Sequence, residues 1–554
     1  MATNDPEVHF MASDQAKVVV DPLALPVELW QAILDDVSDL DLVRFQDVSL
    51  YAHDIVWDST PLRYRAEQFR LCTADGPASQ DLTLDARLVA QKEWHKSWRS
   101  FGRSVATLHT FERGTYPEPY ISASLFADPV ASETANRGCF DTLRFIRLPS
   151  IRRGVGLQSW ILDDLPEFER APNIFAFDYD QDLLVILQKD EANSVRLIIC
   201  TCSTGAVHPK TTSSLLGCLF DVEFYGFSCL RIHCAMVGWS YSMAGKGQRL
   251  FVWDWTHRRI CLDVITCTMT EESHVKGFAF LDARHIIILF EKVAERQAIL
   301  VVIDCYHDQE GSGAMYPSTS PYDPRIVASL CLPPRRRNRR PKPWASVNIE
   351  CRPCSENAAP ADDARFHWAP HDDIAVVTLL EDELWEHYSI HFHIIIPTHV
   401  LRSRLHAPTT MSQMQPVPWS EWGMHTHTIQ TGWRSLGRDA LCGSRLCAPA
   451  FTLCRLVLFD FAPADVFARH PEPEPDDPEF ARYLRECRVY ASFFDPPGKD
   501  WSALRAPFCA TLTDFGSACA YMLAEDGLVL PYGQPQGAES DAEPSDSRLE
   551  IYTV

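Results

Sequence analysis

Beyond about residue 140 the sequence repeats one pattern, in which a short apolar run precedes a second apolar run that ends in an aspartate-containing turn. Alternation of apolar and polar residues, with turn residues between the runs, is typical of adjacent antiparallel strands. The clearest copies are FAFDYDQDLLVILQ with VRLIICTCSTGAVHP, residues 234–264 and residues 277–305; weaker copies lie at 374–397, 444–463 and 520–554. Repetition of one such unit favours an architecture built from many small sheets.

A β-propeller-like domain is the fold that we expect for this region. At a blade period of about 40 to 50 residues, some six to eight units fit into the remaining length. Closure of the ring would hide the sheet edges, and the final LEIYTV segment could pair with an early strand such as LRFIRLP. Because the spacing is irregular, two β-sandwiches are the alternative.

The N-terminal stretch 25–69 has a different, helical periodicity: LPVELWQAILDDVSDLDLVRFQDVSLYAHDIVWDSTPLRYRAEQF. Its first apolar residues span an arc of roughly 160° on a helical wheel, which is wider than a simple core-facing stripe. Pro26 suits the start of the first helix. Three residues offer side-chain oxygens to cap the second helix, Ser38, Asp39 and Asp41, and Ser49 suits the N-cap of the third. Three short helices with this much apolar surface need a partner to cover it.

This stretch resembles an F-box, because it has the LP-x-E-L opening, the spaced Ile, Leu and Val, and the pair Val48 and Ser49. The resemblance implies docking onto the Skp-type adaptor of a cullin-RING ubiquitin ligase, with the rest of the chain capturing a protein substrate. Nine residues match the family's apolar docking positions: Leu25, Pro26, Leu29, Ile33, Leu34, Val43, Val48, Ile55 and Val56. The alternative is an ordinary helical lobe that packs on its own domain.

The resemblance continues along the chain. LRYRAEQF, ADGP and LTLDARLVAQKEWHKSW are similar to the second helical segment of a large group of F-box proteins from mushroom-forming fungi. Five later stretches also resemble that group, in the same order: LPSIRRG, FDYDQDLLVIL, FVWDW, GFAFLDARHIIIL and VLFDFAP. Trp94, Trp98 and Phe101 lie at helical spacing, which predicts that they anchor this helix to the next domain.

These patterns predict an α+β multidomain protein with a small N-terminal F-box helical module, a helical linker and an all-β propeller-like domain. The expected boundaries are a disordered tail at 1–22, the F-box at 23–70, the linker at 71–110 and the β-domain at 140–554. Polar stretches near 306–346, 464–480 and 531–547 read as loop insertions, because they have too little apolar content to order themselves. The basic run 335–342 reads as a nuclear localisation signal, a patch for acidic substrates or a solvated loop.

Composition restricts the partners and the compartment. The 554 residues carry a formal charge of −23, which argues against a general nucleic-acid or anionic-membrane surface. The nineteen cysteines are scattered and odd in number, which favours reduced thiols. With no secretory signal and no apolar run long enough for a membrane span, we expect an intracellular protein of the cytoplasm, the nucleus or both.

The sequence offers little enzyme chemistry. Ser240 replaces the first glycine of a possible phosphate loop, and His-Glu-x-x-His and Gly-x-Ser-x-Gly motifs are absent. Cys351 with Cys354 and His391 with His393 have ligand-like spacing but no further donors nearby, so no metal and no cofactor are expected. We therefore expect a non-catalytic adaptor; the alternatives are a β-domain enzyme and a scaffold that acts without a ligase.

The substrate-binding residues cannot be read from the sequence. Four tryptophans are candidates, although tryptophan in such repeats is usually part of the blade core: Trp253, Trp255, Trp419 and Trp422.

Overall fold

The chain divides into two compact units, residues 1–69 and residues 70–554. The computed structural model describes residues 25–71, 73–99, 107–112, 120–130, 140, 142–163, 174–189, 195–211, 215–218, 224–243, 247–257, 259–265, 273–292, 297–305, 325–333, 346–351, 364–368, 373–382, 389–406, 415–431, 440–449, 456–461, 508–512, 522–524, 526–531 and 548–553. The tail expected at 1–22 lies outside these residues. The first unit ends one residue before the boundary that we expected at residue 70.

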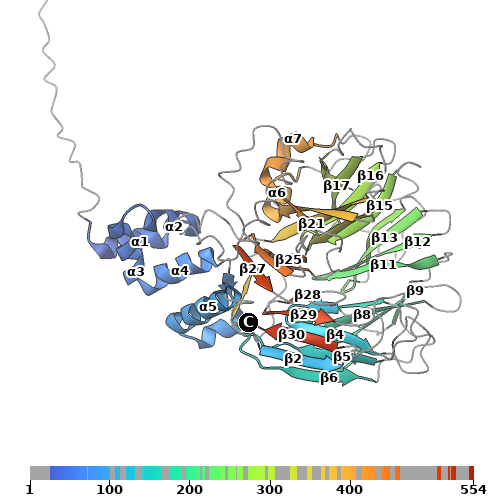
Figure 1. Ribbon diagram of the computed structural model, residues 1–554, viewed down its shortest axis with the longest axis horizontal. Coiled ribbons are helices and arrows are strands. Elements are labelled where there is room, and N and C mark those ends of the chain that lie inside the picture. The colour runs from blue at the N-terminus through green and yellow to red at the C-terminus, as the bar shows by residue number, and fades with distance from the viewer. Residues whose placement is uncertain are drawn as a thin grey trace, which may run out of the picture. The chain divides into compact units, whose positions relative to one another are not determined.

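The first unit is helical (Figure 1). It contains α1 (Val27–Asp35), α2 (Asp39–Gln46), α3 (Leu50–Asp58) and α4 (Thr60–Arg70). Pro26 precedes α1, and the side chains of Ser38 and Ser49 accept hydrogen bonds from the backbone N–H groups of Asp41 and Ala52. Of the three candidates for the second helix, Ser38 is the N-cap, and the predicted N-cap of the third helix, Ser49, is confirmed.

A small apolar core holds these helices together. Its buried members come from all four helices: Leu34, Leu42, Val43, Ile55, Val56, Leu62 and Ala66. Trp30 and Phe45 pack beside it with ring centroids 5.2 Å apart. With so few buried side chains, each one contributes a large share of the unit's stability.

The segment expected as a helical linker at 71–110 belongs to the second unit. It contains β1 (Thr73–Asp75), a 3-10 helix at Pro77–Asp81 and α5 (Leu84–Arg99), and β1 pairs with β20 (Phe366–Trp368). Trp94 and Trp98 are buried, and the Arg445 guanidinium lies 4.6 Å and 4.5 Å from their ring centroids. The predicted anchoring of this helix is confirmed for both tryptophans, whereas Phe101 lies outside the described residues.

The rest of the second unit is a β-propeller. The described residues form seven four-stranded antiparallel sheets, which we number as blades in chain order. Blade 1 contains β3 (Tyr120–Ser122), β4 (Leu125–Val130), β5 (Thr142–Arg147) and β6 (Gln158–Leu162); blade 2 contains β7 (Ile174–Asp178), β8 (Leu183–Lys189), β9 (Val195–Thr201) and β10 (Leu215–Cys218); blade 3 contains β11 (Phe224–His233), β12 (Met236–Met243), β13 (Gly247–Asp254) and β14 (Arg259–Ile265); blade 4 contains β15 (Ser273–Phe280), β16 (His285–Lys292), β17 (Gln297–Asp304) and β18 (Ile326–Cys331).

The remaining three blades complete the ring. Blade 5 contains β19 (Ser346–Cys351), β21 (Ile374–Asp382), β22 (Ser389–Pro397) and β23 (His427–Thr431); blade 6 contains β24 (Leu441–Cys442), β25 (Arg445–Pro449), β26 (Leu456–Asp460) and β27 (Phe508–Leu512); blade 7 contains β28 (Met522–Ala524), β29 (Gly527–Pro531), β30 (Arg548–Thr553) and β2 (Thr107–Glu112). First strands of neighbouring blades contact one another in the order β24, β28, β3, β7, β11, β15 and β19, so the first strand is the innermost of each blade. The fold class predicted from the sequence is therefore confirmed.

Strands from the two ends of the second unit share blade 7. In Figure 1, the red strands β29 and β30 lie among blue strands that include β2. The β30 strand pairs with β2 in the register Thr107↔Thr553 and with β29 on its other side. The segment LRFIRLP, which we expected as the partner of β30, instead forms β5. That expectation was wrong because β5 already has both edges paired, with β4 and β6.

Two expected boundaries also differ. The first propeller strands, β2 to β4, precede residue 140; their signal is weak because β2 and β3 are short or irregular and β4 contains Pro129, a residue unfavourable to strands. The insertion expected near 306–346 contains β18, and most of its other residues lie outside the described part of the chain. The insertions expected near 464–480 and 531–547 lie outside it apart from Pro531, which ends β29.

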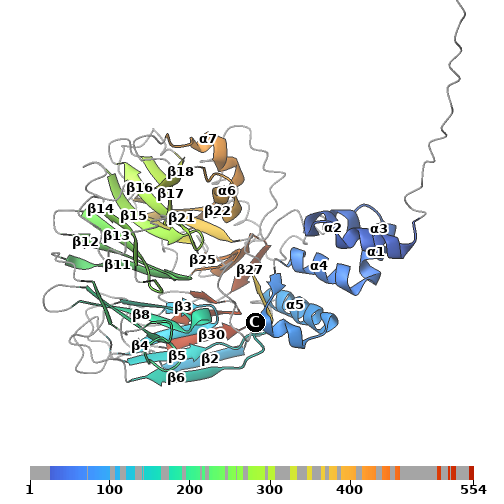
Figure 2. The same ribbon diagram turned by 180° about the vertical axis from the view of Figure 1, so that it is seen from behind.

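Blade 5 carries an insertion between β22 and β23 that contains α6 (Thr398–Arg402) and α7 (Trp419–Trp422), seen from behind in Figure 2. It pairs with the outermost strand of blade 4: the Val417 carbonyl accepts from the N–H of Cys331, and the Val417 N–H donates to Ser329. This pairing covers a sheet edge that other chains could otherwise extend. None of the helices in the described ranges is both long and apolar enough to cross a membrane.

Candidate functional site

The nine residues matched to the docking positions fall into two groups. Leu34, Val43, Ile55 and Val56 are buried in the core of the helical unit. The other five lie at or near the surface: Leu25, Pro26, Leu29, Ile33 and Val48. A buried side chain cannot touch a partner while the unit is folded, so the first group holds the helices in place and only the second group is available for docking.

An apolar stripe follows one side of α1. Pro26, Leu29 and Ile33 are spaced three and four residues apart, so they lie above one another on the helix. Leu29 is 52% exposed and Ile33 is 48% exposed, whereas Leu34 points into the core. The helix therefore uses one side for its own fold and leaves an adjacent apolar side uncovered.

Further exposed apolar residues lie at α3 and near the start of α1, where matching to the motif missed them. Val27, Leu50, Tyr51 and Trp57 are exposed, and Leu50 is 84% exposed. The Tyr51 hydroxyl donates to the Leu25 carbonyl oxygen at 3.5 Å, which places the start of α3 beside the start of α1. The sequence spacing of α3 could have predicted this exposure, because Leu50 and Trp57 lie on the side of the helix opposite the buried Ala52, Ile55 and Val56.

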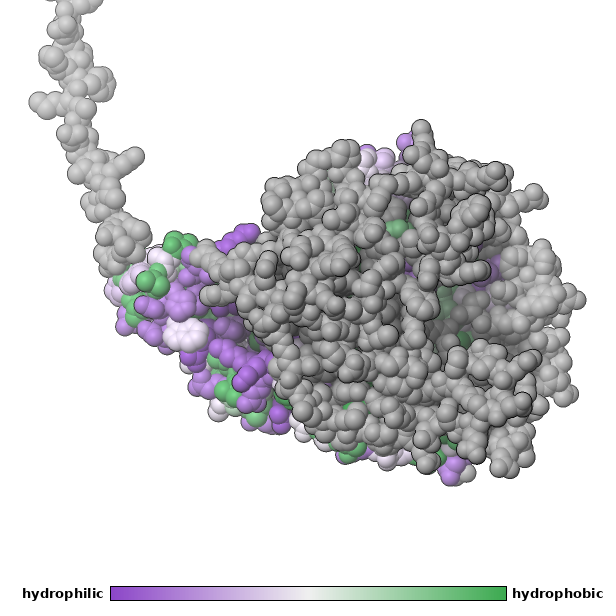
Figure 3. Space-filling model, in the orientation of Figure 1, coloured by the Kyte–Doolittle hydropathy of each residue, from purple (hydrophilic) through white to green (hydrophobic). Residues whose placement is uncertain are grey.

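Exposure of large apolar side chains is concentrated in the helical unit. Among the described residues, seven of the twelve exposed large apolar side chains lie between residues 27 and 57. Figure 3 shows green apolar atoms between purple polar ones on the surface of this unit. Concentration of apolar surface in one small unit is a feature of binding sites. We call the exposed residues Leu29, Ile33, Val48 and Leu50 the apolar surface of the helical unit.

The tryptophans considered as substrate-binding candidates are not on a surface. Trp253, Trp255, Trp419 and Trp422 are all buried. The Trp255 indole donates to the Cys234 carbonyl and the Trp422 indole donates to the Cys331 carbonyl, so both indoles have partners inside the propeller. They are core residues, as the usual burial of blade tryptophans predicts.

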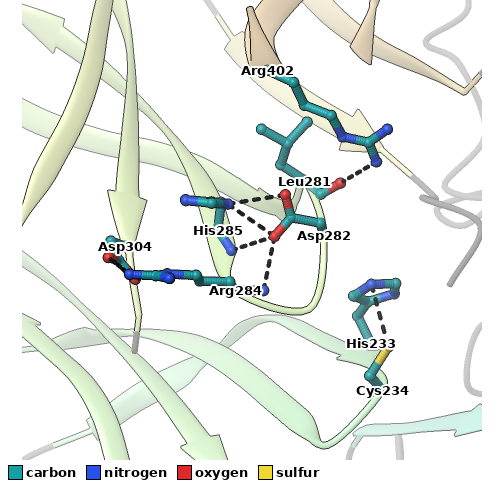
Figure 4. A network of polar contacts seen from close by, with 8 residues as sticks. All are labelled: His233, Cys234, Leu281, Asp282, Arg284, His285, Asp304 and Arg402. Atoms are coloured by element: carbon teal, nitrogen blue, oxygen red, sulfur yellow. Dashed lines mark hydrogen bonds and ion pairs between the residues drawn. The ribbon is translucent and has the colours of Figure 1, made fainter. Parts of the chain in front are cut away.

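The aspartates at the strand ends close turns, as Figure 4 shows for blade 4. Asp282 accepts hydrogen bonds from the backbone N–H groups of Arg284 and His285 and lies 2.9 Å from the His285 ring. The Arg284 guanidinium makes two bonds to Asp304, at 2.8 and 2.6 Å. Hydrogen bonding with His285 lowers the pKa of Asp282 against the opposing effect of burial, which is the larger single contribution. These carboxylates stabilise turns, and their oxygens already accept hydrogen bonds from the turn residues.

His233 and Cys234, near this network, resemble a nucleophile with its base. The Cys234 sulfur lies 3.5 Å from the His233 Nε2. Burial lowers the pKa of His233 to about 4, so the imidazole cannot retain the proton of an activated thiol at neutral pH. The positive φ of Cys234, 52°, recurs at Ala123 and Gly443 in the same turn of other blades, so it belongs to the hairpin. The pair has no feature that requires a catalytic explanation.

Three of the residues with ligand-like spacing lie on strands of blade 5: Cys351 on β19, and His391 and His393 on β22. In the described part of the chain, no three His, Cys, Asp or Glu residues are arranged to hold a metal ion. His391 and His393 stack along β22 with centroids 6.3 Å apart, and His393 lies 3.0 Å from the Thr378 hydroxyl. Cys351 is buried, and Cys354 lies outside the described residues.

Comparison with known proteins adds little to this picture. No family model and no curated protein matches the chain. Among solved structures, the chain is similar to the β-propeller domain of the Trilobed protease from Pyrococcus furiosus, which is described as having an open velcro topology. The match has 7% identity and a TM-score of 0.25 and covers 64% of this chain and 76% of that one. Such a likeness supports no argument about activity; the propeller assignment here comes from the sheets themselves.

Proposed function

We propose that this chain is the substrate-recognition adaptor of a Skp-cullin-F-box type ubiquitin ligase. In this proposal the helical unit docks onto a Skp-type adaptor, the propeller binds a protein substrate, and catalysis is left to other subunits of the ligase. The observation that supports it best is the apolar surface of the helical unit, because a unit with so small a core gains nothing by exposing Leu29 and Ile33 to water.

The apolar surface is large enough to drive docking. Burying a leucine, isoleucine or valine side chain contributes roughly 1.5 to 3 kcal/mol. Leu29, Ile33, Val48 and Leu50 together would offset much of the entropy lost on association. A cluster of this kind in the centre of an interface is where most binding energy is usually found.

The propeller supports the second half of the proposal in general terms only. Propellers present loops from several blades on one face, where protein partners commonly bind. The formal charge of −23 favours substrates with basic surfaces over acidic ones. An adaptor of this kind would act inside the cell, in the cytoplasm or the nucleus.

The test is direct binding of a purified Skp-type adaptor to the full chain, measured by calorimetry. Leu29→Asp combined with Ile33→Asp should weaken binding by about 1,000-fold or more, since two apolar contacts are lost and two charges are introduced into the interface. Ile161→Asp is the matched control, because Ile161 is 59% exposed on β6 of the propeller. Equal binding by the double variant and the wild type would contradict the proposal, as would a wild-type chain with no measurable affinity.

A further inference from the structure

One guanidinium group holds the end of α1. Arg65, on α4, donates from Nη1 to the carbonyl oxygens of Leu34 and Asp35 at 3.2 and 3.0 Å. Its Nη2 donates to the carbonyl of Val37 at 2.7 Å. The Nε and Nη2 atoms also donate to one carboxylate oxygen of Asp39, at 3.0 and 2.7 Å. Five hydrogen bonds from one side chain thus join α4 to the end of α1 and the start of α2.

The carbonyl groups of Leu34 and Asp35 that Arg65 binds lie at the end of α1. The last carbonyls of a helix have no donor within the helix. The last turn of α1 contains no basic residue, and the backbone N–H of the C-cap residue, Asp36, bonds to the carbonyl of Ile33, not to those of Leu34 or Asp35. A positive charge at this end also interacts favourably with the helix dipole. Arg65 therefore supplies from another helix the C-terminal cap that α1 does not contain.

The position of this cap is relevant to docking. Ile33 lies in the last turn of α1, directly before Leu34, whose carbonyl Arg65 binds. A nine-residue helix is marginal in water without tertiary support. Leu34 is the one residue of α1 buried in the core, so Arg65 provides a second attachment at the same end. Without it, the last turn and the Ile33 side chain would lose their fixed orientation.

We propose that Arg65 is a positioning residue for partner docking: its fork of hydrogen bonds sets the end of α1 so that Leu29 and Ile33 meet a Skp-type adaptor in one orientation. This inference rests on the function proposed above. Arg65 itself is only partly exposed, at 29%, and acts through α1. Preorganisation of this kind raises affinity by removing the cost of ordering the helix on binding.

The chemistry distinguishes arginine from lysine at this position. A guanidinium presents five donors in a planar fork, whereas an ammonium is a single point of charge. Three carbonyls and a carboxylate arranged around the fork suit the guanidinium alone. Arg65→Lys should therefore keep the charge near the helix end and recover only part of the function that Arg65→Ala loses.

The experiment measures affinity for a purified Skp-type adaptor at a temperature well below unfolding. We expect Arg65→Ala to weaken binding about 20-fold and Arg65→Lys about 5-fold, the losses expected when charge-assisted hydrogen bonds are removed. Arg44→Ala is the matched control, because Arg44 is an exposed arginine of the same unit whose ion pair with Asp41 is 3.6 Å long. It should bind within 2-fold of the wild type, by the small effect expected of exposed pairs.

A second control separates positioning from general stability. Leu42→Ala removes core volume from the helical unit at a residue outside the nine matched docking positions, and it changes neither Arg65 nor its acceptors. It should lower stability yet keep affinity, and hydrogen exchange of the last α1 amides should accelerate more in Arg65→Ala than in Leu42→Ala. Equal affinity losses in the two variants, or an Arg65→Ala variant that binds like the wild type, would overturn the role of Arg65. A wild-type chain that does not bind would instead overturn the proposed function.

Discussion

The helical unit and the propeller use large apolar side chains in opposite ways. The propeller buries its tryptophans and phenylalanines between blades, as with Trp239, Phe251 and Phe278. The helical unit, far smaller, leaves Leu29, Ile33, Val48 and Leu50 in contact with water. The difference indicates that the exposure is concentrated in the smaller unit, which is the pattern of a binding surface rather than of poor packing throughout the chain.

The largest effect that we expect in this comparison comes from the tryptophan that anchors α5 to the propeller. Trp94 is fully buried, and its indole donates to the Asp526 carboxylate, which also accepts from the Ser150 hydroxyl. Trp94→Ala should destabilise the second unit by about 3 to 5 kcal/mol, because it creates a cavity and removes a donor from a buried carboxylate. Denaturant unfolding measures the loss.

The control for Trp94 lies on the same helix. Val89 is 54% exposed, so Val89→Ala should change stability by less than about 0.5 kcal/mol. If Trp94→Ala had as little effect on stability as Val89→Ala, α5 would be only loosely attached to the propeller. That result would contradict the conclusion that buried apolar side chains of the second unit stabilise its fold.

A pair of leucines five residues apart on α1 sharpens the comparison within the helical unit. Leu34→Ala should lower the free energy of unfolding of this unit by about 3 kcal/mol, because Leu34 is buried in its core. Leu29→Ala should change it by less than about 0.5 kcal/mol, because Leu29 is half exposed. Hydrogen exchange of the α2 and α3 amides reports the stability of this unit separately.

The same two variants should rank differently in binding. At a temperature at which both are folded, Leu29→Ala should weaken capture of a Skp-type adaptor more than Leu34→Ala does. The reverse order in binding, with Leu34 more important than Leu29 in the folded unit, would contradict the division of α1 into a core side and a docking side.

The smallest effect is a pH dependence that belongs to the propeller. Burial lowers the pKa of His393 to about 3 and that of His233 to about 4, both below the ordinary value of 6.5. Between pH 6.5 and these values the unfolded chain binds protons that the folded chain does not, so stability is lost as the pH falls through 6.5. Each histidine contributes up to about 1.4 kcal/mol per pH unit.

One carboxyl group acts in the opposite direction. Burial, together with the charge of Asp180, raises the pKa of Asp178 to about 6, so the folded state gains protons first as the pH falls below that value. A variant isolates the histidine contribution: His393→Gln should lower the slope of unfolding free energy against pH between 7 and 5.5, measured by urea titration. An unchanged slope would show that His393 is protonated alike in both states.

The propeller was predictable from the sequence because its repeat is regular where the blades are regular. In blades 3, 4 and 6 the third strand ends in an aspartate, at Asp254, Asp304 and Asp460, which is the turn signal that marked the repeat. The partner of the final strand was not predictable, because β2 is distant in sequence and does not follow the blade pattern. Pairing between distant strands depends on ring closure, which local periodicity cannot report.

The candidate site was predictable as a region but not residue by residue. Periodicity identified the apolar positions of α1, yet a wide apolar arc does not reveal which part of the arc faces the core. Ile33 and Leu34 are adjacent in the sequence, but Ile33 is exposed and Leu34 is buried. The role of Arg65 was not visible either, because its acceptors are backbone carbonyls some thirty residues upstream, which carry no sequence signature. Leu50 and Trp57 could have been found from the spacing of α3.

Blade 7 constrains the order in which the second unit can assemble. Its outermost strand, β2, is among the first segments of this unit to leave the ribosome, while β30, the strand that it pairs with, is among the last. Until translation reaches β30, the early strand has no neighbour and the ring stays open, exposing edges that chaperones recognise. A chain that ends before β30 would therefore retain its helical unit but leave β2 without its partner strand and the ring open.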